Sequence, residues 1–225
     1  IGEGLLGHGK GIEAEKAFVH AISSAEVAFG NKSIEVVAAT VKLTNAYAQN
    51  IYYDEILTLV KPYFDNIFVE KFTNIEYARL FIVFNKMNSR FFTDEYKELR
   101  FEDPIQTLRK IAINYKEQLE PMEVIDLELT ILKNTFYSMV GDYASPTAHV
   151  PEIDVIENRI PILKPLIPEL DKLIALARKN KKTQFVLPEL LSWRARLAYE
   201  TKDYAKANTF YVEALSLAKM FFDEA

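Results

Sequence analysis

The stretch 191–217 reads LSWRARLAYETKDYAKANTFYVEALSL, and of the whole chain it indicates the fold most clearly. Apolar, small and aromatic residues recur in it at the spacing of a helix face: Leu191, Ala195, Tyr199, Ala207, Tyr211, Ala214, Leu215 and Leu217. The pair Asp203-Tyr204 separates two such runs, as a turn would. Alanine lets two antiparallel helices approach closely, and an aromatic side chain fills the space beside them. We therefore expect a helical hairpin, with helices near 186–200 and 204–220.

This order of residue sizes resembles one unit of the tetratricopeptide repeat (TPR), in which a helix A pairs with a helix B. Similar units begin at Ile1 and at Leu43, and weaker ones cover 75–118 and 122–182. The units are longer than the basic repeat of about 34 residues, and HEAT-like repeats are the alternative architecture. The resemblance implies an all-α, right-handed α-solenoid of about five helical hairpins. It would form a single domain over residues 1–225 that starts inside a repeat.

The repeat that contains Ile1 lacks the first turns of its helix A. We therefore expect apolar residues of its helix B, such as Phe18 and Ile22, to lie at an open edge of the solenoid. Terminal repeats need a polar or covered outer face. A missing segment, a neighbouring domain or a second copy of the chain, in a homodimer, would supply the cover.

Prolines interrupt several of the expected helices. Pro62 falls inside a helix B, and Pro161, Pro165 and Pro168 fall within the segment 152–182. Proline removes a backbone hydrogen bond and clashes with the preceding turn. We therefore expect two short helices, and not one long one, over 152–182.

Composition narrows the class of protein. The 27 basic and 32 acidic residues give a net charge of −5, whereas a surface that binds nucleic acid is usually basic. No apolar run reaches the ~18 residues that a membrane helix needs. The chain has no cysteine, which excludes disulfides, thiolate metal sites and a cysteine nucleophile. This fits a reducing compartment, and we expect a cytoplasmic protein without membrane or direct nucleic-acid contacts.

Motifs for catalysis are missing from the sequence. His8, His20 and His149 are far apart and form no metal-binding pair. The glycines near the N-terminus superficially suggest a phosphate-binding loop, but no strand precedes them. We therefore expect a protein that is not an enzyme and that carries no metal and no cofactor.

An asparagine recurs in the same setting on three successive A helices. Asn45, Asn85 and Asn134 each lie between two apolar residues that are four positions apart, in the pattern apolar-x-Asn-x-apolar. The flanking residues should pack inward, which turns the asparagine off that stripe. In a TPR superhelix this direction faces the concave groove, where an amide can pair with a peptide backbone as donor and acceptor. The alternative is that these are ordinary exposed asparagines.

Neighbouring positions on the A helices complete the predicted site. We expect a short peptide or an extended partner segment to bind to these residues: Asn45, Gln49, Phe81, Asn85, Thr130, Asn134 and Arg196. TPR domains bind peptides or protein segments in this groove, so the resemblance implies an interaction module.

The spacing also resembles a narrower group, the bacterial quorum-sensing regulators of the Rgg, PlcR and Rap type. These have about five long TPR units and groove asparagines that hold a signalling peptide. The resemblance implies a sensor domain in transcription regulation. Many such regulators carry an upstream helix-turn-helix domain. The given sequence holds none, but it starts inside a repeat, which leaves open an upstream DNA-binding domain that precedes residue 1. The alternative is a scaffold or adaptor that gathers folded partners through an exposed apolar patch.

Overall fold

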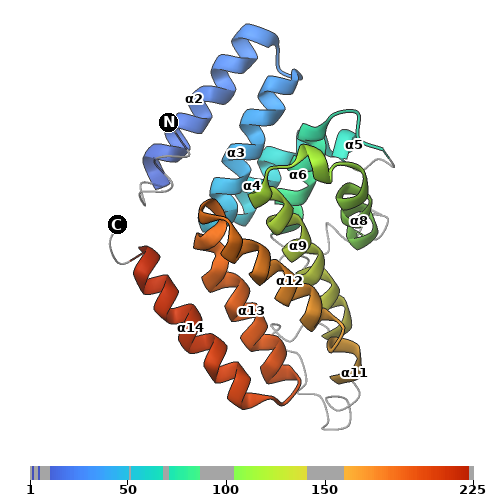
Figure 1. Ribbon diagram of the computed structural model, residues 1–225. Helices are drawn as coiled ribbons and strands as arrows, with labels where there is room; N and C mark the ends of the chain where they lie inside the picture. Colours follow the sequence, from blue (N-terminus) through green and yellow to red (C-terminus); the bar gives the residue numbers. More distant parts are fainter. Residues whose placement is uncertain are drawn as a thin grey trace. The chain divides into compact units, whose positions relative to one another are not determined.

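The computed structural model describes Gly2, Leu5 and residues 11–50, 52–67, 71–86, 104–140 and 160–222. All regular secondary structure in these ranges is helical, without a strand, so the protein is all-α there (Figure 1). The chain divides into two compact units, Ile1–Gln118 and Leu119–Ala225. No helix within the described ranges is long and apolar enough to span a bilayer.

The first unit is built from helices of unequal length. In order they are α2 (Gly11–Phe29), α3 (Ile34–Asn50), α4 (Tyr53–Val60), η1 (Lys61–Tyr63), α5 (Phe64–Ile67), α6 (Ile75–Lys86), α8 (Pro104–Asn114) and η2 (Lys116–Gln118). The predicted break at Pro62 is confirmed, because a short 3₁₀ segment replaces the α-helix there. Helix α3 packs against both α2 and α6.

Helices α2 and α3 form an antiparallel hairpin. Gly30 makes the turn with a φ of +91°, a conformation that glycine adopts without steric cost. A small apolar cluster joins the two helices, and it comprises Ala14, Phe18, Leu43 and Ala46. The Tyr47 hydroxyl, near the end of α3, donates a hydrogen bond to Glu15, near the start of α2, over 2.9 Å.

The expectation that Phe18 lies at an open edge is wrong. Its side chain is only 7% exposed. Gly2 packs so closely on the Phe18 ring that a Cβ at Gly2 would lie 2.6 Å from it. The chain itself therefore covers this ring, and Ile22 is partly buried beside it. The solvent-exposed apolar residues of α2 are others, among them Val27 and Phe29.

The second unit contains the helices on which the candidate site lies. They are α9 (Pro121–Val140), α11 (Ile160–Leu163), α12 (Leu166–Lys179), η3 (Lys181–Val186), α13 (Leu187–Glu200) and α14 (Tyr204–Phe222). The predicted proline break is confirmed where the structure describes the segment, because α11 ends before Pro165 and α12 begins after it. The core of this unit centres on Phe136, Leu170, Leu190 and Leu191, all fully buried.

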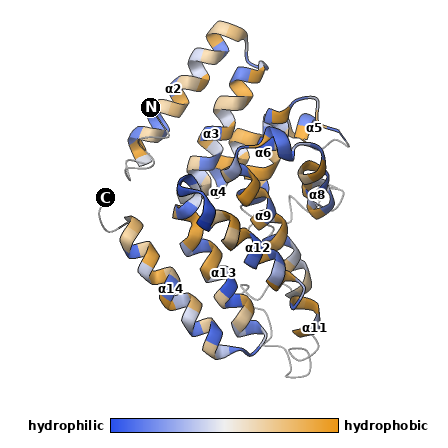
Figure 2. Cartoon of the chain, in the orientation of Figure 1, coloured by the Kyte–Doolittle hydropathy of each residue, from blue (hydrophilic) through white to orange (hydrophobic). Residues whose placement is uncertain are grey.

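Helices α13 and α14 form the hairpin that the sequence predicts, and their bounds agree with the predicted ones to within two residues. Ala195 and Ala207 are both buried, as a close contact between these helices requires. The turn holds Lys202 at a φ of +64°. The Asp203 N–H donates to the Ala198 carbonyl and the Lys202 N–H to the Tyr199 carbonyl, which is the Schellman arrangement of a helix end. Figure 2 shows hydrophobic residues recurring between hydrophilic ones along both helices.

Candidate peptide-binding face

Two of the three predicted asparagines have the same geometry. The Asn85 Nδ2 donates to the Phe81 carbonyl over 2.8 Å, and the Asn134 Nδ2 donates to the Thr130 carbonyl over 2.9 Å. Both side chains are buried. Asn45 differs, because it is half-buried and its Oδ1 accepts a hydrogen bond from the Lys86 Nζ over 3.1 Å.

The remaining predicted residues fall in unlike surroundings. The Phe81 and Thr130 side chains are each 2% exposed, and the Thr130 hydroxyl donates to the Asp126 carbonyl. The Gln49 side chain lies outside the described residues. Arg196 is half-buried on α13. Asn45 and Arg196 are therefore the predicted residues whose described side chains reach solvent. Asn85 and Asn134 are buried and would have to become exposed to hold a peptide.

Side-chain contacts show that α9 and α13 lie side by side and run in the same direction. Lys133 forms an ion pair with Glu189, and the Arg196 Nη1 donates to the Tyr137 hydroxyl oxygen over 3.1 Å. Lys133 precedes Tyr137 on α9, as Glu189 precedes Arg196 on α13. Helix α12 packs against both and returns the chain between them.

A group of aromatic rings and cations lies between these two helices, and we name it the Arg196 cluster: Lys133, Phe136, Tyr137, Trp193 and Arg196. The guanidinium carbon of Arg196 is 4.8 Å from the centroid of the Phe136 ring, 5.4 Å from that of Tyr137 and 5.2 Å from that of Trp193. The rings meet edge to face, with centroids 5.4 to 5.6 Å apart. The Lys133 Nζ lies 5.4 Å from the Trp193 ring. Such contacts hold a cation firmly without neutralising it.

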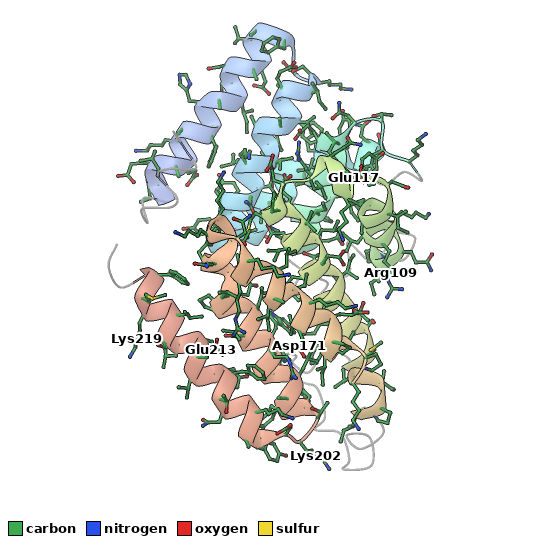
Figure 3. All side chains as sticks on the ribbon, in the orientation of Figure 1. Arg109, Glu117, Asp171, Lys202, Glu213 and Lys219 are labelled. Atoms are coloured by element: carbon green, nitrogen blue, oxygen red, sulfur yellow. The ribbon has the colours of Figure 1, made fainter. Side chains whose placement is uncertain are left out.

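The neighbouring Arg194 differs from Arg196, because it has a carboxylate partner in this unit. It is buried, its Nε donates to Asp171 over 2.7 Å, and its guanidinium stacks on Phe210 at 4.8 Å. Figure 3 labels Asp171 on α12. Arg196 has no carboxylate partner among the residues that the structure describes. Of its several N–H donors, the described contacts use only the one that meets Tyr137.

The arrangement suits recognition of a ligand. A planar guanidinium with unused donors can bind a carboxylate through two parallel hydrogen bonds. Of the two cations of the cluster, Lys133 is paired with Glu189, whose side chain is 50% exposed. No grouping of side chains that could hold a metal ion occurs in the described ranges.

Arg196 was among the predicted residues, but the rings around it were not. The signal that could have found them is the helical spacing of Trp193 and Arg196 on one helix and of Lys133 and Tyr137 on another. What the sequence does not contain is the pairing of those two stripes. That pairing depends on how α12 returns the chain.

A pocket lies in the first unit. It is lined by Gly11, Ile12, Glu15, Ala46, Tyr47 and Tyr52. Burial, followed by the hydrogen bond to Glu15, raises the pKa of Tyr47 to about 12. The phenol therefore stays neutral over the physiological range and keeps the Glu15 carboxylate hydrogen-bonded.

Comparison with known proteins gives no matching family model, no matching curated protein and no matching solved structure.

Proposed function

We propose that the chain is a protein-interaction module that binds a short peptide or an extended partner segment along the face formed by α9 and α13. The observation that carries the proposal is the Arg196 guanidinium, held among three rings and without a carboxylate partner in the described residues. Residues that dominate the binding energy of an interface are enriched in tryptophan, tyrosine and arginine. The Arg196 cluster contains all three.

The proposed architecture is a right-handed α-solenoid of about five TPR-like hairpins. Two features support it. Helices α13 and α14 form a hairpin with buried alanines, and α9 and α13 run in parallel with α12 returning between them. Consecutive A helices of a TPR solenoid have this relation, and they line its concave surface.

A narrower proposal is that the module is the cytoplasmic sensor domain of a bacterial peptide-responsive transcription regulator, as in quorum sensing. The shared setting of Asn45, Asn85 and Asn134 supports it. Asn85 and Asn134 would exchange their bonds to the Phe81 and Thr130 carbonyls for bonds to a peptide backbone.

The test uses the full chain, immobilised and exposed to a pool of random heptapeptides without tryptophan. Retained peptides are identified by mass spectrometry, and affinities are measured through the emission of Trp193, the single tryptophan of the chain. We expect Tyr137→Ala to weaken binding by about tenfold, as loss of an interface anchor does. The matched control is Tyr211→Ala on α14, which should bind as the unchanged protein does. Failure to retain any peptide, or equal binding by Tyr137→Ala, would reject the proposal.

A scaffold or adaptor is the second candidate, and one observation favours it. Large apolar side chains on α14 are open to solvent, with Tyr211 46%, Val212 61% and Leu215 58% exposed. Apolar residues grouped on one helix face often mark a contact with another folded protein. In that case Tyr211→Ala on α14 would abolish partner binding, and Tyr137→Ala on α9 would not.

A further inference from the structure

We infer that the ligand of the Arg196 cluster carries a carboxylate, either an acidic side chain or the C-terminus of a peptide. The inference rests on the proposed function and names the chemical group that the site would recognise.

The first step concerns the cost of the half-buried guanidinium. Removing a cation from water is unfavourable unless hydrogen bonds and opposite charge compensate for it. Three ring faces and the Tyr137 hydroxyl compensate in part. Arg194, two positions earlier on the same helix, has a carboxylate partner, because its Nε donates to Asp171. Among the residues that the structure describes, none gives Arg196 such a carboxylate, and a bound ligand can provide it.

The second step concerns geometry. Rings pack against Arg196 at 4.8 to 5.4 Å from its central carbon, which restricts the side chain to one region of the face. A guanidinium held in this way is arranged in advance for a planar, two-oxygen acceptor. Binding then loses less side-chain entropy than it would at a flexible surface arginine.

The third step concerns the amount of charge. Lys133 and Arg196 contribute two positive charges, and Lys133 is already paired with Glu189. One positive charge remains, which matches a single carboxylate. A phosphate, with about −1.5 to −2 charges, would need a further cation, and the cluster holds none. Trp193 and Tyr137 are half-buried, so an apolar residue next to the carboxylate would lie on their rings.

The test uses three pools of random heptapeptides, all without tryptophan. The first has Asp or Glu at the central position and both ends capped. The second has no acidic residue but a free C-terminal carboxylate, and the third has no carboxylate at all. Binding to the full chain is followed by Trp193 emission. We expect at least one of the two pools that carry a carboxylate to bind about tenfold more tightly than the third pool, which corresponds to one charge-assisted hydrogen-bonded pair. Binding of the first pool would identify an acidic side chain as the source of the carboxylate, and binding of the second would identify the C-terminus.

Two variants decide whether Arg196 is responsible. Arg196→Gln should remove the preference for the acidic pool, and Arg196→Lys should restore only part of it, because lysine keeps the charge but not the two-pronged geometry. Arg178→Gln is the matched control, because Arg178 lies in the same unit but is paired with Glu213. Figure 3 labels Glu213 on α14. The control variant should keep the full preference. Circular dichroism checks that each variant is folded.

The outcomes separate this inference from the proposed function. Equal binding of all three pools would overturn the carboxylate inference and leave peptide binding in place. A preference for acidic peptides that persists in folded Arg196→Gln would also overturn it. If no pool binds to the unchanged protein, both the inference and the proposed function are wrong.

Discussion

Arg194 and Arg196 lie two positions apart on α13, and this spacing turns their side chains toward different sides of the helix. Arg194 reaches Asp171 on α12 and Phe210 on α14. Arg196 reaches the aromatic residues of α9 and the adjacent Trp193. The first arginine therefore ties the unit together, whereas the second lies at a face that can receive a ligand. Residue type alone does not distinguish them.

Tyr47 gives a prediction about alkaline stability. Its pKa is raised from 10.0 to about 12, so the folded state holds the neutral phenol while the unfolded chain ionises near pH 10. The stability that this hydroxyl contributes is present below pH 10 and is lost as the pH rises toward 12. We expect the free energy of unfolding to fall more steeply over this window in the unchanged protein than in Tyr47→Phe. Urea unfolding at several pH values measures it, and parallel curves would contradict the assignment.

The sequence pattern around the asparagines predicts their common setting but not their hydrogen bonds. The apolar-x-Asn-x-apolar pattern identifies helical positions with a common setting, and Asn85 and Asn134 do share one geometry. The pattern cannot show that each amide bonds to the carbonyl one turn earlier, because that choice depends on burial. The sequence prediction that all of these amides face a peptide stays a prediction.

Helices are the level at which the sequence was most informative. The bounds of α13 and α14 and the breaks at Pro62 and Pro165 follow from spacing and from the chemistry of proline. The burial of Phe18 was not predicted, because it depends on how closely Gly2 packs on the ring, and helical spacing does not give that contact. Local patterns fix where helices begin and end, and tertiary packing decides which faces are covered.

The α13–α14 hairpin gives a prediction about packing. Ala207 is 3% exposed, and Leu at this position would overfill the contact between the two helices. We expect Ala207→Leu to lower the free energy of unfolding by about 1–3 kcal/mol. Ala205 is exposed on the same helix, so Ala205→Leu is the control and should change stability by less than about 0.5 kcal/mol. Equal melting midpoints for the two variants would show that the alanine contact is not close.

At the scale of the whole molecule, the two compact units predict separate unfolding transitions. Leu43→Ala removes a core side chain of the first unit and should cost about 2–5 kcal/mol there. Trp193 lies in the second unit, so the urea midpoint followed by Trp193 emission should stay unchanged in this variant. Circular dichroism should show that part of the helix content unfolds at a lower urea concentration. Leu190→Ala, in the core of the second unit, should shift the Trp193 midpoint. Coincident shifts in both signals after Leu43→Ala would instead indicate one cooperative domain.

The shielded position of Arg196 on a chain of net charge −5 has a consequence for the kinetics of an acidic ligand. At a distance the ligand meets the summed field of an acidic protein, which repels it and slows its approach. At contact it meets one guanidinium set among rings, where salt screens the attraction much less than on the open surface. Raising the ionic strength should therefore speed association and leave dissociation nearly unchanged. Selectivity among acidic ligands would be expressed in how long each stays bound, and not in how quickly it arrives.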